Sequence, residues 1–124
     1  MFTYREHERL GTLIRDFYEA EKPVAAYCHG LAALVDLTLS DGSYLVAGRT
    51  VTGFSDVEED YSDQAAGVQV MPWRVQPALQ ERGANYISAG LFKAFAVRDG
   101  RLVTGQQQYS GRRVAQLVIE MLGV

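Results

Sequence analysis

The chain has 124 residues, of which 48% are hydrophobic and 22% charged, which suits one domain with its own buried core. Its net charge is −3 and its densest basic point is the pair Arg112–Arg113, so it lacks the basic patch of a nucleic-acid-binding protein. One cysteine cannot form an internal disulfide, and one cysteine with two histidines is too few for a usual structural zinc site.

The first part of the chain predicts a helix, a strand and a second helix. Apolar residues at helical spacing predict a helix over 4–21, which Pro23 would end. The short apolar run Val24–Tyr27 is typical of a buried parallel strand. Apolar residues over 31–39 predict the next helix, and Asp41–Gly42 a turn after it.

The middle of the chain predicts two short strands and a helix. The strands are expected over 44–46 and 50–54. Ser55 stands three residues before Glu58, as in a capping box, and therefore marks a helix start. The acidic stretch 56–60 would occupy the first turn, where negative charge suits the helix dipole.

The last part predicts two helices separated by extended segments. The first helix is expected over 72–82 with Gly83 at its end, although Pro77 would interrupt it. The extended segments are 85–88, 92–98 and 102–104, with a hairpin turn at Asp99–Gly100. Ser110 is expected to cap the final helix. Alternating helices and strands indicate a layered α/β fold in a single domain over 1–124.

The segment around Cys28 has the layout of a nucleophile elbow, in which a strand enters a tight turn and a helix follows at once. Backbone N–H groups at a helix start stabilise negative charge and would lower the pKa of the thiol. The N–H of His29 would be one oxyanion donor, and the small Ala26 and Gly30 would let the backbone approach closely. The alternatives are a buried, inert cysteine and a solvated turn histidine.

Three segments in order resemble the DJ-1/PfpI superfamily of class I glutamine amidotransferase-like domains. They are 22–30 with its Cys-His-Gly triplet, 51–59 with Val-Thr-Gly-Phe and two glutamates, and 99–106 with Asp-Gly-Arg-Leu-Val-Thr-Gly-Gln. The triplet points to the Hsp31-like and PfpI-like branches, and the resemblance spans about 4–123. It implies a flavodoxin-like three-layer α/β/α sandwich with a mostly parallel sheet.

The resemblance also implies roles for particular residues. Cys28 would be the nucleophile, His29 the general acid–base, and His29 with Gly30 the oxyanion and elbow positions. Glu59 would orient the histidine, with Asp56 as the second choice. The alternative for both acidic residues is a solvated helix start. No metal and no organic cofactor are implied.

The implied function is cysteine-dependent chemistry on a small carbonyl substrate, as in glyoxalase III-like conversion of 2-oxoaldehydes, or hydrolysis of an amide. The alternatives are a non-enzymatic redox sensor or stress chaperone, and an inactive partial domain. A lone cysteine, no secretory signal and no apolar run of membrane-spanning length predict a cytoplasmic protein with no membrane and no nucleic-acid partner.

The main departure from the family is length, because the first half of the family's sheet has no counterpart here. In the family that half supplies a glutamate that pairs with the thiol and a second oxyanion N–H. We therefore expect either a truncated or split form, a homo-oligomer, or a complementing chain that supplies the missing half. A second departure is 106–110, where the family has Gln-Asn-Pro; Tyr109 would either reshape the pocket or lie in a loop with relaxed constraints.

Overall fold

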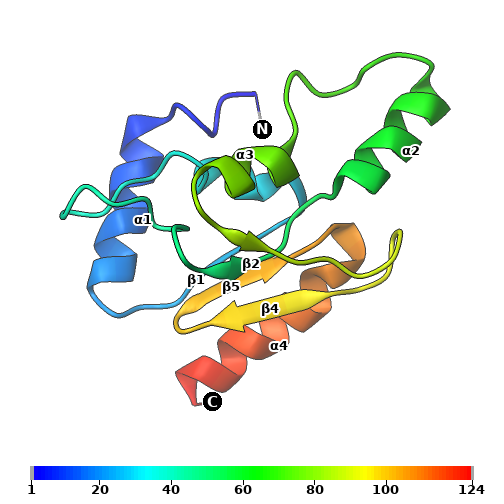
Figure 1. The fold of residues 1–124 in the computed structure, drawn as a ribbon. Coiled ribbons are helices and arrows are strands. Elements are labelled where there is room, and N and C mark those ends of the chain that lie inside the picture. Colours follow the sequence, from blue (N-terminus) through cyan, green and yellow to red (C-terminus); the bar gives the residue numbers. More distant parts are fainter. Residues whose placement is uncertain (1, 124) are drawn as a thin grey trace.

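The computed structural model describes residues 2–123 and has a mixed three-stranded sheet at its centre (Figure 1). The strand order is β1 (Val24–Tyr27), β5 (Leu102–Gly105) and β4 (Ala96–Asp99). β1 runs parallel to β5, and β4 and β5 form an antiparallel hairpin through the Gly100 turn. A second, two-stranded parallel sheet pairs β2 (Thr50–Val51) with β3 (Asn85–Tyr86).

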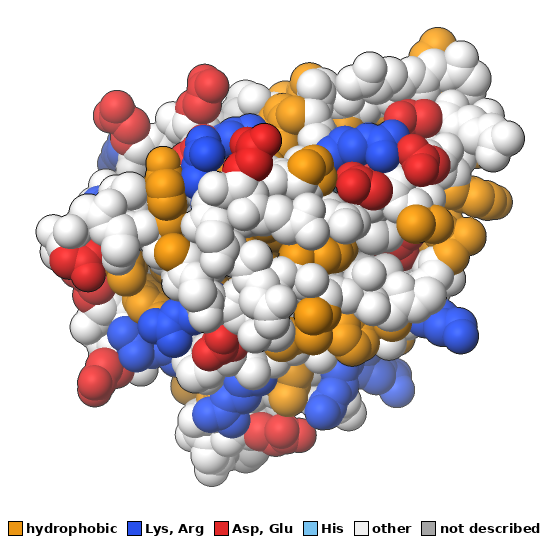
Figure 2. Space-filling view, in the orientation of Figure 1, with side chains coloured by type: hydrophobic (Ala, Val, Ile, Leu, Met, Phe, Trp, Pro, Cys, Tyr) orange, Lys and Arg blue, Asp and Glu red, His pale blue; other side chains and the backbone are white. Residues whose placement is uncertain are grey.

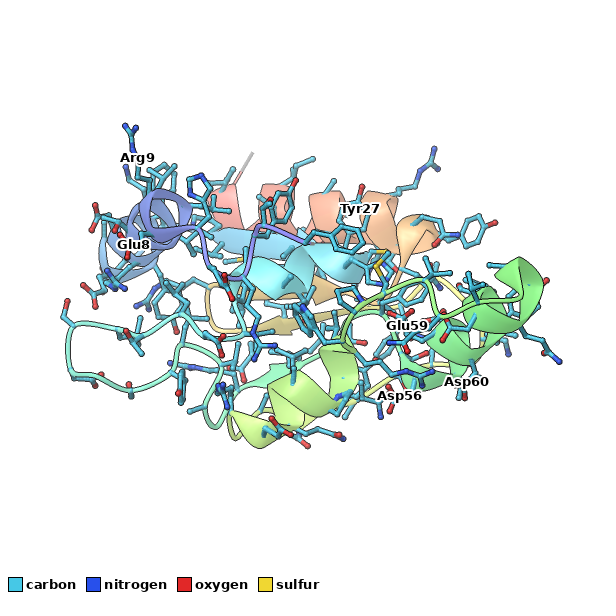
Figure 3. The ribbon with its side chains drawn as sticks, turned by 90° about the horizontal axis from the view of Figure 1, so that it is seen from above. Glu8, Arg9, Tyr27, Asp56, Glu59 and Asp60 are labelled. Carbon is cyan, nitrogen blue, oxygen red and sulfur yellow. The ribbon has the colours of Figure 1, made fainter. Side chains whose placement is uncertain are left out.

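Helices lie on both sides of the central sheet. They are α1 (Glu8–Glu19), α2 (Asp56–Ala66), α3 (Val75–Glu81), α4 (Gly111–Leu122) and two 3₁₀ helices, η1 (Cys28–Ala33) and η2 (Gln108–Ser110). Seen from above, α4 covers one face of the sheet, while η1 and α3 lie on the other (Figure 3). The layers are those of an α/β fold, as the alternating elements predict. No helix within 2–123 is long and apolar enough to cross a membrane.

β5 separates the two cores of the molecule because successive side chains of a strand point to opposite faces. Leu102 belongs to the larger core, which it forms with buried side chains of η1, β2 and α3. Val103 belongs to the smaller core, with Val114 and Leu117 of α4. All four residues of β5 are buried, so this strand is central.

The structure differs from the prediction after the elbow. The helix predicted over 31–39 ends at Ala33, and the predicted strand 44–46 is only one bridge between Thr38 and Tyr44. The N–H groups of Leu34 and Leu37 donate to carbonyls three residues back, so the chain continues as tight turns. Apolar side chains are buried all around this segment, and their spacing therefore did not distinguish a long helix from a compact turn.

Several helix boundaries follow the local chemistry. Ser55 makes the predicted capping box with Glu58 at the start of α2. Pro77 does not interrupt its helix, because it lies in the first turn of α3, where a backbone N–H has no intrahelical partner. Ser110 precedes α4 but does not cap it, since its hydroxyl accepts the N–H of Phe95 at 3.1 Å and η2 runs directly into α4.

The prediction that β1 is buried is wrong. β1 pairs only with β5 and lies at the edge of the sheet, where Ala25 and Tyr27 are exposed. Strands of a parallel sheet are usually buried on both faces, whereas only Val24 of β1 is buried.

Charges of both signs are mixed on the surface. Arg74 pairs with Asp60 at 2.7 Å, and Asp36 pairs with both Arg5 and Arg82. Figure 2 shows acidic and basic side chains interspersed over the visible face, without a broad area of one sign.

Substitution of Gly105 by Ala is predicted to destabilise the fold. A Cβ there would lie 2.6 Å from Cγ2 of Val114 and 2.8 Å from Cβ of Tyr27, in the contact between β5, β1 and α4. Overpacking of this kind costs about 1–3 kcal/mol. The matched control is Gly30→Ala, where nothing lies within 4 Å of the added carbon. Urea unfolding measures both, and equal midpoints for the two variants would contradict this packing.

Candidate active site

The elbow lies where β1 ends and η1 begins. Tyr27 is extended, with φ −145° and ψ 163°, and Cys28 has a φ of 59°. A positive φ is unfavourable for a residue with a side chain and persists where the surrounding structure holds it. The parallel pairing of Tyr27 with Gly105 holds the strand up to this turn. Cys28 is therefore presented at the end of the sheet, as the elbow layout predicts.

A chain of contacts joins Cys28, His29 and Glu59. The Sγ atom of Cys28 lies 3.7 Å from Nδ1 of His29, and Nε2 of His29 lies 2.6 Å from Oε1 of Glu59. The Glu59 side chain is buried, with 2% exposed, and that of His29 is 21% exposed. An Nε2–H donated to this carboxylate leaves the Nδ1 lone pair toward the sulfur. In this arrangement Nδ1 of His29 can accept the proton of the Cys28 thiol.

The start of α2 and the ring of Phe54 fix the position of His29. The capping box of Ser55 and Glu58 sets the first turn of α2, from which Glu59 points toward the β1–η1 turn (Figure 3). The buried ring of Phe54 lies against the imidazole, with centroids 4.2 Å apart and planes tilted by 30°. The imidazole of His29 is therefore held at its edge by Glu59 and at its face by Phe54.

Asp56, the second choice for the orienting carboxylate, belongs to another network. It lies near Arg74, with 3.7 Å between Oδ1 and Nη1, and its N–H donates to Gln76 at 2.9 Å. In Figure 3 the carboxylates of Asp56 and Glu59 both lie beside the start of α2. The structure brings Glu59, and not Asp56, to the histidine.

Glu58 is fully buried and anchors the loop beside the site. Its Oε1 accepts hydrogen bonds from the N–H and hydroxyl of Ser55 and from Nε2 of Gln106, and its Oε2 accepts the N–H of Phe92. The sequence identified Glu58 only as a capping residue. Its partners Gln106 and Phe92 lie far along the chain, so no local pattern could show this role.

The segment 106–110 is held in place by buried glutamine side chains. Gln106 and Gln107 are fully buried, and Nε2 of Gln107 donates to the carbonyl of Lys93 at 2.6 Å. Tyr109 is exposed, and its ring meets that of Phe92 edge to face at 6.4 Å. The glutamines therefore hold the loop that carries Phe92 against the site.

Phe92 is the centre of an aromatic cluster beside His29. Its ring meets Phe54 at 6.4 Å and Tyr61 at 5.3 Å, both edge to face, in addition to Tyr109. Its φ of 52° is a strained value for a residue with a bulky side chain. The cluster forms an apolar wall next to the Cys28–His29–Glu59 chain.

The expectation of a lowered thiol pKa is wrong for this chain. Burial raises the pKa of Cys28 above its usual value, and the nearby carboxylates of Glu58 and Glu59 raise it further. The backbone N–H of His29 acts in the opposite direction but does not prevail. The helix that begins at Cys28 is a six-residue 3₁₀ turn, which offers less stabilisation of the thiolate than a long α-helix.

Gly30 does not serve the close approach that the sequence suggested, because the space around it is open. The tight position is Gly53, where a Cβ would lie 2.9 Å from Cγ1 of Val75 and 3.1 Å from Cγ of Leu31. The glycine of the Val-Thr-Gly-Phe segment therefore lets the chain after β2 pass close to η1 and α3, next to Phe54, whose ring lies against His29.

The comparisons with known proteins define the class. The model of the DJ-1/PfpI family matches residues 2–121, and the chain belongs to this family. It is 38% identical over 120 residues to a probable glutathione-independent glyoxalase, hsp3103, of Schizosaccharomyces pombe, covering 93% of this chain and 45% of the relative.

Solved structures show the same fold. The crystal structure of glyoxalase III from Candida albicans matches with a TM-score of 0.84 and 29% identity, over 96% of this chain and 51% of that one. The 24 kDa rapid encystment protein of Francisella tularensis matches with a TM-score of 0.87 and 26% identity, over 94% and 51%. The expected α/β fold is thereby confirmed. The chain spans about half the length of the relatives it matches.

We predict that alkylation of Cys28 by iodoacetamide has an apparent pKa above the value of about 8.5 for a free thiol. Glu59→Gln removes a nearby negative charge and should lower that pKa, whereas Asp60→Asn, on the exposed side of α2, should not. Rates measured from pH 6 to 11 give the midpoints.

The same titration affects stability. A folded-state pKa above the unfolded one favours the protonated thiol, so its contribution to stability is present below the unfolded pKa and is lost as the pH rises through the folded one. Cys28→Ser should remove this dependence. An alkylation midpoint below that of a free thiol would contradict the burial and charges around Cys28.

We predict that Glu58→Gln lowers the free energy of unfolding by about 1–3 kcal/mol, because the amide cannot accept all the donors that face the carboxylate. Glu120→Gln on α4, whose exposed side chain is 3.8 Å from Arg113, is the control and should change little. Thermal unfolding compares the two, and an unchanged midpoint for Glu58→Gln would rule out the anchoring role.

Proposed function

We propose that this chain carries the Cys28-centred site of a glyoxalase III-like enzyme, which converts a small 2-oxoaldehyde into the 2-hydroxy acid. The observation behind the proposal is the contact chain from Cys28 through His29 to the buried Glu59. The names of its relatives in two yeasts, a probable glutathione-independent glyoxalase and a glyoxalase III, support it. A cytoplasmic location, where a single free thiol stays reduced, is part of the proposal.

In the first step the Cys28 sulfur attacks the aldehyde carbon. The thiol proton passes to Nδ1 of His29, and the aldehyde oxygen becomes the hydroxyl of a hemithioacetal after protonation. Glu59 stabilises the imidazolium through its bond to Nε2. The raised pKa of Cys28 makes this coupled proton transfer necessary, because the resting thiol is protonated at neutral pH.

In the second step a proton moves between the two carbons of the substrate. His29 removes it from the former aldehyde carbon and returns it to the adjacent carbon, through an enediol. The aldehyde carbon is oxidised to a thioester while the ketone carbon is reduced to an alcohol, so no external oxidant or reductant is needed. Water then cleaves the thioester, which releases the 2-hydroxy acid and restores the thiol.

The aromatic cluster supports a small substrate. Phe92, Phe54 and Tyr61 form an apolar wall beside His29, suited to the alkyl end of a short 2-oxoaldehyde. Excluding water from the enediol would limit side reactions.

The redox-sensor alternative has less support. Sensor cysteines are oxidised through an exposed thiolate of lowered pKa. Cys28 has a raised pKa and is partly buried. Amide hydrolysis by the same nucleophile remains the second activity to assay, since a bovine relative, 31% identical, is named as a glutamine amidotransferase-like class 1 domain-containing protein.

We predict that methylglyoxal is converted to lactate by this chain, alone or with a complementing segment, and that Cys28→Ser abolishes the conversion. Glu59→Gln should lower the rate by about 10²-fold, because His29 loses its orienting charge. Asp56→Asn, in the Arg74 network, is the matched control on the same helix turn and should retain the rate.

Loss of methylglyoxal and appearance of lactate are followed together by chromatography. Conversion that survives Cys28→Ser would rule out the proposed mechanism. Release of ammonia from small amides without any lactate would assign the site to amide hydrolysis instead.

A further inference from the structure

We propose that Phe92 is a specificity-determining residue of the site, and that its ring limits the group on the ketone carbon of the 2-oxoaldehyde to a short alkyl chain. The inference rests on the proposed function and narrows the substrate class within it. Three features of Phe92 support it: its backbone conformation, the hydrogen bonds that hold its loop, and the place of its ring beside His29.

The backbone of Phe92 is held in a conformation that costs free energy. Its φ of 52° lies in the left-handed region, which glycine adopts freely and a residue with a bulky side chain rarely does. Strain of this kind persists where the surrounding structure holds it, and it clusters at functional sites. A glycine would make the same turn without strain, so the phenylalanine ring contributes something that the turn itself does not require.

Packing of a core does not explain the ring. Of the two cores within residues 2–123, neither includes Phe92. Two of its partners, Tyr61 and Tyr109, are themselves 54% and 61% exposed, so these contacts bury little apolar surface. Its third partner, Phe54, is buried and lies against His29. Phe92 is only partly buried, and it is therefore the accessible ring of the cluster next to Phe54 and the histidine.

Two buried polar side chains hold the loop of Phe92. Oε2 of Glu58 accepts the N–H of Phe92 at 2.9 Å. Gln106 binds Ala89 with both ends of its amide, since its Oε1 accepts the N–H at 2.8 Å and its Nε2 donates to the carbonyl at 3.3 Å. The same Nε2 donates to Glu58 at 3.1 Å, which joins the two into one network. A satisfied buried network is rigid, so the ring of Phe92 has a fixed position before any substrate binds.

This fixed loop lies close to the nucleophile. Figure 1 shows the start of α2, the loop between β3 and β4 and the start of α4 together at one end of the molecule. Glu58, which holds Phe92, is near enough to Cys28 for its charge to raise the pKa of the thiol. From the sulfur the contacts run through His29 and Phe54 to Phe92.

The geometry has a consequence for the substrate. Cys28 binds the aldehyde carbon, and the variable group of a 2-oxoaldehyde is on the adjacent ketone carbon. His29 must reach both carbons for the proton transfer, so the variable group lies along the wall of rings beside the imidazole. A methyl group fits against the ring of Phe92, whereas a phenyl group would overlap it, and the loop is not free to move aside. Rejection of a larger group by a fixed wall is worth about tenfold or more.

The first test measures access to the sulfur and needs no turnover. Cys28 is the single cysteine, so alkylation reports on its surroundings alone. Iodoacetamide and N-benzyliodoacetamide have the same reactive group and differ in bulk. The ratio of their rates, each divided by the rate with glutathione, is independent of the thiol pKa. Phe92→Ala should raise the relative rate of the benzyl reagent about tenfold. Leu91→Ala, an exposed neighbour on the same loop, is the matched control and should leave the ratio unchanged.

A second variant separates the ring from the backbone. Phe92→Gly removes the same ring and also relieves the positive φ. It should therefore unfold at a higher temperature than Phe92→Ala, whereas Leu91→Gly should unfold at a lower temperature than Leu91→Ala. The alkylation ratio of Phe92→Gly should equal that of Phe92→Ala, so the test does not depend on the folding of one variant.

An unchanged alkylation ratio in both Phe92 variants, or an equal rise in Leu91→Ala, overturns the proposal. Turnover of methylglyoxal and phenylglyoxal is compared in the same variants, and the preference for methylglyoxal, as a ratio of kcat/KM values, should fall about tenfold in Phe92→Ala. A raised alkylation ratio without any lactate formation leaves Phe92 as the boundary of the site and rejects the proposed function. Lactate formation with an unchanged ratio supports the function and rejects the role of Phe92.

Discussion

The parallel pairing of β1 with β5 is the constraint on which the site depends. β5 is buried along its whole length and divides the two cores, so its position is set by packing on both faces. Among the described strands β1 pairs with β5 alone, and the register matches Tyr27, the last residue of β1, to Gly105. The chain then turns sharply at Cys28, which has a φ of 59°. A backbone conformation that is costly in isolation is held by contacts elsewhere.

The site combines two elements that are distant in the sequence. Cys28 and His29 belong to the turn after β1, and Glu59 comes from the first turn of α2, thirty residues later. The Ser55 capping box fixes the start of that helix, and Gly53 lets the preceding segment pass close to η1. Glu58 and Glu59 are adjacent but bind different partners. Glu58 accepts hydrogen bonds from four donors and holds the loop of Phe92. Glu59 binds His29.

Burial has opposite consequences for the members of the contact chain. It strengthens the bond between Glu59 and His29, since a charged hydrogen bond gains from a low local dielectric. The same burial raises the pKa of Cys28, because the adjacent carboxylates and the apolar surroundings oppose a second negative charge. Reactivity at the sulfur therefore depends on transferring its proton within the site.

Local chemistry in the sequence determined the features that need only neighbouring residues. The elbow at Cys28, the Ser55 capping box, the Asp99–Gly100 hairpin and the strands β1 and β5 all follow from spacing, turn residues and periodicity, and the family resemblance singled out Glu59. Tertiary structure alone decided the rest. The helix after the elbow is a short 3₁₀ helix that ends at Ala33, and within the described residues β1 is an edge strand because only β5 pairs with it. The raised pKa of Cys28 and the anchoring by Gln106 have the same origin, since burial and charge depend on groups that the fold brings together from distant positions.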